Sequence, residues 1–215
     1  HDMSITNAKG SYELNSAVVD SMSYFHELAG LISYRQEEKD FVDFNIQKLL
    51  PHKMSQYGPA LAAGDINGDG YDDVLIGGAK LKGPLAVIQN ADGRFESRKF
   101  LTDSEEIYKG TEDMGLLLFD ADSDNDLDLY VASGSYENLP NTNAHRDCFY
   151  YNDGKGNFKL DTTIFPLNYT SKSCIKAADF DNDGDLDLFI GGRVLPGSYP
   201  KPVSSFIYRN DSKGG

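Results

Sequence analysis

The sequence has few of the groups that enzymes use for catalysis. Its four histidines, His1, His26, His52 and His145, are scattered without the spacing of a metal or catalytic motif. We find no nucleophile elbow, phosphate-binding loop or zinc motif. The sequence therefore offers no candidate catalytic residue, and we predict that the protein is not an enzyme.

Positive charge is also scarce, and long hydrophobic runs are missing. The 215 residues include 20 Lys and Arg against 34 Asp and Glu, which gives a net charge of −14 and an isoelectric point near 4.5. A partner with a phosphate backbone requires a basic stripe, so a nucleic acid is disfavoured. No window has the length and hydrophobicity of a membrane span, and no secretory signal peptide is visible.

The acidic residues are concentrated in three similar segments. These read "DINGDGYDDVLI" from Asp65, "DADSDNDLDLYV" from Asp120 and "DFDNDGDLDLFI" from Asp179. They share the pattern D-x-[DN]-x-D-[GN]-x-x-D, and their starts lie 55 and 59 residues apart. Self-similarity at such a period indicates a repeat architecture.

Most of the net charge belongs to these three acidic loops, which we define as residues 65–73, 120–128 and 179–187. Without their eleven aspartates at positions 1, 3, 5 and 9, the net charge would be only −3. The acidity is therefore local and does not indicate a disordered acidic tail. The eleven are Asp65, Asp69, Asp73, Asp120, Asp122, Asp124, Asp128, Asp179, Asp181, Asp183 and Asp187.

Each acidic loop has the chemistry of a calcium site, because Ca²⁺ takes six to eight oxygen ligands. Side chains at positions 1, 3, 5 and 9 and the carbonyl of position 7 would supply these oxygens. Position 6 is Gly70, Asn125 or Gly184, residues that tolerate the left-handed turn that curls the backbone around an ion. We predict three calcium ions, the first held more weakly because Asn67 replaces an aspartate. The predicted ligands are Asp65, Asn67, Asp69, Tyr71 and Asp73; Asp120, Asp122, Asp124, Asp126 and Asp128; and Asp179, Asp181, Asp183, Asp185 and Asp187.

Three other interpretations of the loops are weaker. An EF-hand needs a glutamate at position 12 and flanking helices, whereas Ile76, Val131 and Ile190 stand there and the following residues favour strand. A metal-free Asp/Gly turn does not explain three copies in register. A glycosidase acid/base pair explains the aspartates less well than an ion does, because bound calcium would keep them ionised and occupy their lone pairs.

The remainder of each repeat predicts an antiparallel meander of four strands. A short apolar strand precedes each loop (59–64, 115–119 and 174–178), and a second strand follows it. A third strand ends in an asparagine turn, and Phe95 and Phe158 open a fourth. The prediction is therefore an all-β protein made of β-propeller blades, at residues 59–113, 114–173 and 174–215, with the last blade incomplete.

Residues 1–58 give a less regular pattern. Apolar residues from Val18 to Ile32 recur at helical spacing, and residues 39–46 alternate like a strand. The segment is either a cap on the first blade or the remnant of a preceding blade, and we favour the latter. Cys148 and Cys174 begin strands of successive blades. They are either buried thiols or an inter-blade disulfide, and the sequence does not decide between these.

The segments "GDINGDGYDDVLIGGA", "FDADSDNDLDLYVASG" and "ADFDNDGDLDLFIGGRVLPGSYP" resemble FG-GAP/VCBS repeats, the blades of integrin-α-type propellers. Residues 40–70 and 191–211 are similar to bacterial VCBS-repeat proteins associated with an ASPIC/UnbV region. The resemblance implies calcium-stiffened blades, export from the cell and a binding role. Propellers usually have four to eight blades. Three loops therefore suggest a fragment, an open propeller, or one completed by further blades or a second copy.

We therefore expect a non-catalytic, extracellular or cell-envelope module for adhesion or recognition. A hydrolase or lyase acting on polysaccharide is the alternative, and a nucleic-acid-binding protein is a second one that the low isoelectric point disfavours. A protein or glycan partner is expected on the face opposite the acidic loops. The connections on that face, residues 134–147 and 191–204, are longer in the second and third repeats than in the first. They carry Tyr136, Asn141, His145, Arg146, Arg193, Tyr199 and Lys201, which either recognise the partner or pack over neighbouring blades.

Overall fold

The computed structural model describes residues 25–28, 30–100, 110 and 112–211. The chain divides into two compact units, residues 1–31 and 32–215, and every described strand belongs to the second. The described residues of the first unit form no helix. The helical spacing from Val18 to Ile32 therefore produces no helix at residues 25–28 and 30–32, and the rest of that segment lies outside the described residues.

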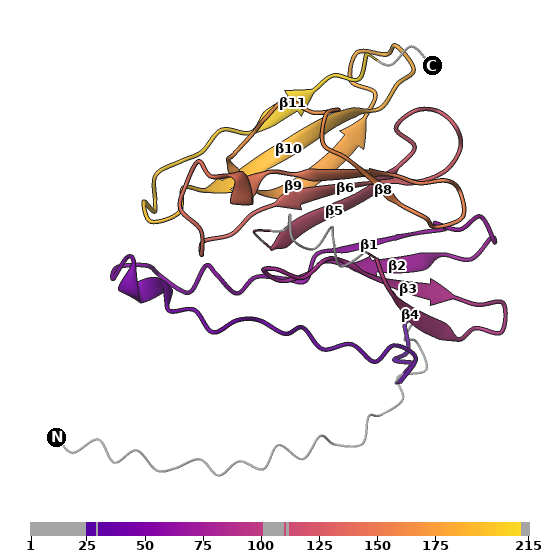
Figure 1. Ribbon diagram of the computed structural model, residues 1–215, viewed down its shortest axis with the longest axis horizontal. Coiled ribbons are helices and arrows are strands. Elements are labelled where there is room, and N and C mark those ends of the chain that lie inside the picture. Colours follow the sequence, from indigo (N-terminus) through magenta and orange to yellow (C-terminus); the bar gives the residue numbers. More distant parts are fainter. Residues whose placement is uncertain (1–24, 29, 101–109, 111, 212–215) are drawn as a thin grey trace, which may run out of the picture. The chain divides into compact units, whose positions relative to one another are not determined.

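Three antiparallel sheets make up the second unit (Figure 1). In each sheet the hydrogen-bonded neighbours are consecutive in the sequence, so each is a meander, and the all-β blade architecture is confirmed. The first blade contains β1 (Leu61–Gly64), β2 (Asp73–Ile76), β3 (Leu85–Gln89) and β4 (Phe95–Lys99). The second contains β5 (Asp113–Phe119), β6 (Asp128–Ser133), β7 (Cys148–Tyr151) and β8 (Lys159–Asp161). The third contains β9 (Ser171–Ala178), β10 (Asp187–Val194) and β11 (Phe206–Tyr208).

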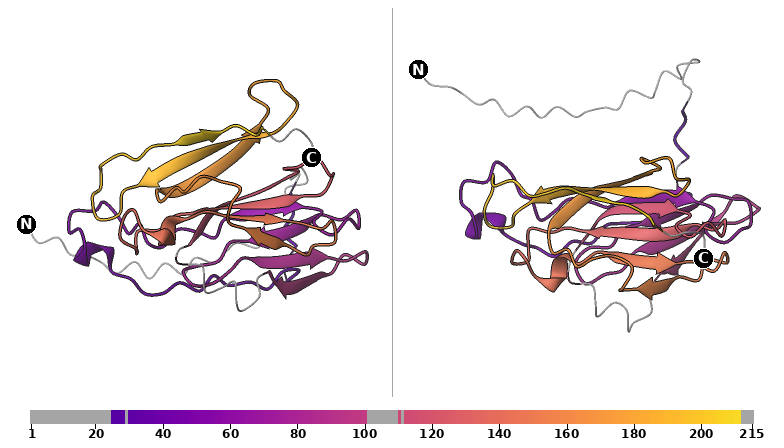
Figure 2. Two further views of the ribbon diagram at one scale, coloured as in Figure 1. Left: turned by 45° about the horizontal axis from the view of Figure 1, so that its top comes forward. Right: turned by 90° about the horizontal axis from the view of Figure 1, so that it is seen from above.

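The blades stack face to face, and the two views of Figure 2 show their sheets as successive layers. On β6, Leu129 and Val131 pack toward the first blade, whereas Tyr130 and Ala132 pack toward the third. All four side chains are completely buried. Because the middle sheet is covered on both faces, its strands are apolar on both sides.

The segment before the first blade does not form the strand predicted for residues 39–46. Residues Asp43–Asn45 form a 3-10 helix, η1, instead. The buried carboxylate of Asp43 accepts the backbone N–H groups of Met54 and Ser55 and so folds this segment back on itself. Met54 then packs with Leu50, Tyr136 and Val194 in a small third core. This tertiary contact overrides the alternating local pattern.

The two cysteines occupy different faces of the stack. Cys148 is half-buried on β7 and packs in the core between the first and second blades. Cys174 is exposed on β9, so the prediction of a buried thiol is wrong for it. The two are not joined by a disulfide.

Among the described residues, no helix has the length and hydrophobicity needed to cross a membrane.

Candidate metal centres

Each acidic loop joins the first and second strands of its blade, and all three follow one backbone path. Position 6 is left-handed in each, with φ of +88° at Gly70, +70° at Asn125 and +102° at Gly184. The left-handed turn predicted at position 6 is therefore confirmed. Position 4 is also left-handed, at Gly68, Ser123 and Asn182. The sequence analysis missed this second turn because those three residues share no single side-chain type.

The same hydrogen bonds hold the curl closed in the three loops. The position-1 carboxylates of Asp65, Asp120 and Asp179 accept the position-6 N–H at 2.8, 3.0 and 3.2 Å. The position-5 carboxylates accept the position-7 N–H at 2.9 to 3.0 Å. Backbone donors thus fix the orientation of the position-1 and position-5 carboxylates in each loop.

In two loops the carboxylates converge as a metal site requires. One oxygen from each of Asp120, Asp122 and Asp124 lies within 4.8 Å of the others. The same is true of Asp179, Asp181 and Asp187. Like charges at such distances repel one another, and a hard divalent cation that accepts several oxygens would remove the repulsion. The residues present therefore fit calcium.

The first loop is arranged differently at position 3. Asn67 donates its side-chain amide to the Asp69 carboxylate at 3.1 Å and accepts the Asp69 N–H at 3.0 Å. Its acidic residues do not form a converging set of three within 4.8 Å. That the first loop binds calcium most weakly stays a prediction.

The position-9 aspartates are buried and join two parts of the blade. Asp73, Asp128 and Asp187 are at most 2% exposed. One oxygen of each accepts the position-2 N–H of its own loop, at 3.0 to 3.2 Å. The other oxygen accepts an N–H at the end of the third strand, at 2.7 to 2.9 Å. The turns between strands 3 and 4 therefore lie beside the acidic loops, as alternating connections in a meander require.

Burial and mutual repulsion shift the acidity of the second loop. Burial raises the pKa of Asp128 to about 7, although N–H groups of Asn152 and Ala121 oppose the rise. Burial, with the neighbouring carboxylates of Asp124 and Asp122, raises the pKa of Asp126 to about 6. In the absence of a cation, this loop therefore retains protons at pH values where free aspartates have lost them.

Asparagines at the end of the third strand connect successive blades. The side-chain amide of Asn152 donates to the Ile66 carbonyl at 2.8 Å, and that of Asn210 donates to the Ala121 carbonyl at 3.1 Å. Ile66 and Ala121 each occupy position 2 of the preceding blade's acidic loop. We call this contact the asparagine bridge. The sequence had identified these asparagines only as turn residues.

The opposite ends of the blades hold several residues predicted for partner recognition, but two of these are buried. Tyr136 is 1% exposed and donates its hydroxyl to Gln47 at 2.8 Å. His145 is completely buried. These positions support the packing alternative, since side chains without exposed surface cannot recognise a partner. Of the other five, Asn141 and Lys201 are exposed, and Arg146, Arg193 and Tyr199 are partly buried.

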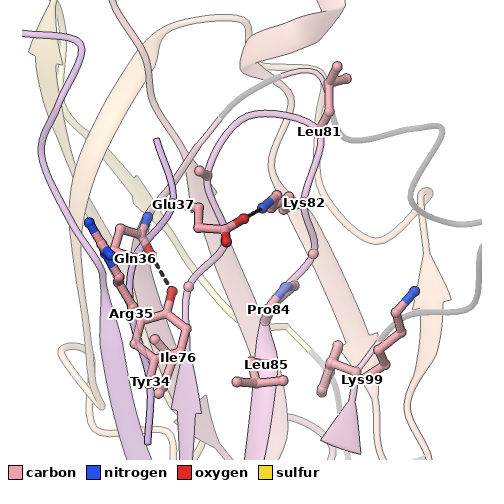
Figure 3. A pocket seen from close by; sticks show the side chains of 15 residues that line it. Tyr34, Arg35, Gln36, Glu37, Ile76, Leu81, Lys82, Pro84, Leu85 and Lys99 are labelled. Carbon is pink, nitrogen blue, oxygen red and sulfur yellow. Dashed lines mark hydrogen bonds and ion pairs between the residues drawn. The ribbon is translucent and has the colours of Figure 1, made fainter. Parts of the chain in front are cut away.

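A cavity of about 480 Å³ lies at this opposite end of the first blade. In Figure 3, Tyr34 and Glu37 line one wall, and Lys82 and Lys99 lie across from them. Glu37 and Lys82 form an ion pair within it. The sequence analysis missed this cavity because residues 34–37 belong to no repeat.

A buried carboxyl group also lies at this end. Glu112 is 2% exposed, and within the described part of the chain neither of its carboxylate oxygens has a hydrogen-bond partner. Burial raises the pKa of Glu112 to about 8, and the charges of Glu38 and Glu137 add to the rise. Arg193 opposes the shift. The side chain is therefore protonated at neutral pH.

Comparison with protein families identifies the repeats. A family model described as FG-GAP-like repeat matches residues 65–131 and 120–190. Together the two matches cover more than half of the chain and contain all three acidic loops. No curated protein matches the chain.

Proposed function

The chain belongs to the FG-GAP-like repeat family, and we propose that it is a calcium-stabilised, non-catalytic binding module of the cell envelope or extracellular space. The observation that carries the proposal is the repetition of one loop geometry three times. Each loop orients oxygens at positions 1 and 5 with the same backbone donors. Such repetition is expected where each blade must hold the same ion.

Calcium would neutralise the carboxylates and fix the loop between strands 1 and 2. Positions 1, 3, 5 and 9 would hold it through side chains, and position 7 through its carbonyl. Extracellular calcium modules bind the ion with a Kd of about 10⁻⁴ to 10⁻³ M, so an exported location would keep the three loops occupied even at modest affinity. Family membership supports the same location and a binding role.

The test is thermal unfolding with calcium and with a chelator, combined with elemental analysis. An ion that binds only the folded chain raises its free energy of unfolding by about 2.7 kcal/mol per site when calcium is at 100 times Kd. The midpoint temperature rises as a result. We expect three ions per chain and a clear rise in the midpoint. An unchanged midpoint with no bound calcium would contradict the proposal.

Variants within the third loop test the ligand assignment. Asp183→Ala removes a side-chain ligand and should lower the bound calcium from three ions to two. Asp185→Ala is the matched control, because position 7 would ligate through its carbonyl. Gly184→Val should also reduce binding, since a β-branched residue resists φ of +102°. Equal losses from Asp183→Ala and Asp185→Ala would show that the ligands are wrongly assigned.

The partner is a protein or glycan bound at the ends opposite the acidic loops. The cavity of about 480 Å³ supports this placement, because its mixed aromatic, acidic and basic lining offers both donors and acceptors. A glycan array, run beside a nucleic-acid binding assay over a range of salt, tests the partner class. Tyr34→Ala should then weaken a glycan ligand at least tenfold and leave the calcium-dependent midpoint unchanged. Salt-dependent nucleic-acid binding without any glycan or protein binding would refute this partner class.

A further inference from the structure

The cavity of about 480 Å³ beside the first blade reverses the charge balance of the chain. Acidic residues outnumber basic ones by 34 to 20 in the whole sequence. The lining of the cavity instead carries three cations, Arg35, Lys82 and Lys99, and one carboxylate, Glu37. A hollow lined mainly by one sign of charge attracts ligands of the opposite sign. Salt screens more distant charges beyond about 8 Å at physiological ionic strength, so these local cations favour an anionic ligand.

The apolar part of the lining comes from strands that are paired on both sides. Ile76 on β2 is paired with Leu61 on β1 and with Leu85 on β3. Leu85 is paired in turn with Lys99 on β4. An extended peptide commonly binds by adding a strand to a free sheet edge, and β2 and β3 offer no such edge. This part of the cavity therefore offers apolar side chains to a ligand.

A tight connection between β2 and β3 holds Lys82 at the cavity. The backbone N–H of Lys82 donates to the Ala79 carbonyl at 2.9 Å. A β-carbon at Gly78 would lie 2.1 Å from the Lys82 carbonyl, so the connection folds closely back on itself. Leu81 has φ of +65° and a side chain that is 60% exposed. A left-handed backbone is strained for a bulky residue, and such strain is concentrated at functional sites.

An acidic group of the chain itself occupies the Lys82 ammonium. Glu37 reaches it from the segment before the first blade and forms an ion pair with it (Figure 3). Lys82 lowers the pKa of Glu37, so this carboxylate is ionised at neutral pH. Both side chains are more than half exposed, and exposed ion pairs contribute little to stability. Another anion can therefore replace Glu37 at Lys82.

Tyr34 adds an aromatic face beside this ion pair. It lines the cavity together with Glu37, and its hydroxyl donates to Gln36. Burial raises the pKa of Tyr34, Glu38 adds to the rise and Lys82 opposes it, which places the Lys82 charge near the hydroxyl. The cavity thus combines apolar and aromatic surface with exposed cations. A uronic acid or sulfated sugar has matching groups, because its ring has C–H faces and its edge carries hydroxyls and an anion.

We infer that this cavity binds an anionic saccharide and that Glu37 occupies the position of its anionic group in the free protein. The inference rests on the proposed binding function and names the class of glycan. The carboxylate or sulfate of the ligand replaces the Glu37 carboxylate at Lys82, and Lys99 adds to the attraction. The sugar ring packs against Tyr34, and the released Glu37 side chain moves into solvent.

The test uses an array of uronate-containing and sulfated oligosaccharides, each beside its methyl-esterified or desulfated counterpart. We expect binding to anionic members, and binding about tenfold or more weaker to the uncharged counterparts. The two parts of the array distinguish a carboxylate from a sulfate as the anionic group. Binding should weaken as salt is raised, because the ammonium groups that attract the ligand are exposed.

Substitutions at the ion pair test the role of Glu37. Lys82→Gln should weaken binding of the selected saccharide about fivefold or more. Glu37→Gln should strengthen it about twofold to fivefold, because the ligand no longer competes with an internal carboxylate. In the Lys82→Gln background, Glu37→Gln should have no effect, since both changes act through one contact. Lys155→Gln, which removes an exposed lysine between β7 and β8, should leave the affinity unchanged.

Several results would overturn the inference. These are the absence of binding to any anionic saccharide, equal binding of charged and uncharged members, and weaker binding in Glu37→Gln. Hexaglutamate that binds through Lys82 in place of a saccharide would make the partner an acidic peptide. Saccharide binding that is lost in Asp183→Ala but kept in Lys82→Gln would place the ligand at the calcium loops. Calcium-dependent melting is measured on every variant, so a chain that keeps it without binding an anionic saccharide refutes this inference alone.

Discussion

Replacing Glu112 with glutamine should remove a large pH dependence from the stability of the protein. Burial raises the pKa of this carboxyl group from 4.5 to about 8, and Glu38 and Glu137 add to the shift. The folded chain keeps the proton over a range in which the unfolded chain has lost it. The free energy of unfolding therefore falls as the pH rises from about 4.5 to about 8, and then levels off.

The shift sets the size of the effect. Each pKa unit corresponds to about 1.36 kcal/mol, so the rise from 4.5 to about 8 gives at most about 5 kcal/mol. Relaxation of the surroundings and entry of water reduce this figure, and we expect about 2–4 kcal/mol. Glutamine has nearly the same shape and carries no charge at any of these pH values, so Glu112→Gln should be the more stable protein at pH 9.

The assay is urea unfolding from pH 5 to pH 9 in saturating calcium, which keeps the aspartates of the acidic loops ionised throughout. Between these limits, the free energy of unfolding of the wild type should fall with pH relative to that of Glu112→Gln. The difference in slope should correspond to about one proton released on unfolding. Glu96→Gln, on an exposed position of β4, should follow the wild type. If the free energy of unfolding depends on pH in the same way in the wild type and in Glu112→Gln, Glu112 does not hold a proton in the folded chain.

Three further substitutions test the contacts between blades and at the ends opposite the loops. Asn152→Ala removes the first asparagine bridge and should cost about 1–3 kcal/mol in urea unfolding, because the carbonyls of Ile66 and Leu127 lose their donor; Asn90→Ala, which changes an exposed asparagine in a turn of the first blade, should cost little. Tyr136→Ala leaves a cavity in the third core and should cost about 3–5 kcal/mol, without changing the number of calcium ions bound. Gly134→Ala places a methyl carbon 1.9 Å from the Lys172 carbonyl, so it should lower the thermal midpoint by several degrees or prevent folding. A loss below 0.5 kcal/mol for Asn152→Ala, a loss of calcium in Tyr136→Ala, or an unchanged midpoint for Gly134→Ala would each contradict the corresponding contact.

The sequence predicts the blades well because each strand is defined by its distance from a repeated loop. Aspartates at position 9 mark the first residue of β2, β6 and β10 in all three blades. The segment before the first blade has no second copy with which to compare it. Its alternating residues 39–46 indicate a strand, but the buried carboxylate of Asp43 binds backbone donors eleven and twelve residues away and produces a turn of 3-10 helix.

Within the metal centres, the sequence predicts which side chains are acidic and where the chain turns at position 6. It does not predict the backbone partners of those side chains, because an N–H donor has no signature in the sequence. The two hydrogen bonds of Asp128, to Ala121 and Asn152, are such a case. At the opposite ends, Tyr136 and exposed Asn141 occur in one polar, aromatic stretch, and only the fold distinguishes the packed residue from the accessible one.

The hydrogen bonds around position 2 give a physical reason why calcium would stiffen the whole stack rather than single loops. The Ala121 N–H donates to Asp128, and the Ala121 carbonyl accepts the Asn210 amide from the third blade. Asn152 likewise binds Asp128 of its own blade and the Ile66 carbonyl of the first. An ion that restrains Asp128 therefore restrains one residue that contacts the preceding blade and one that contacts the next. Because these bonds lie at the loop ends of the strands, the opposite ends remain available to vary in length and to carry the proposed partner site.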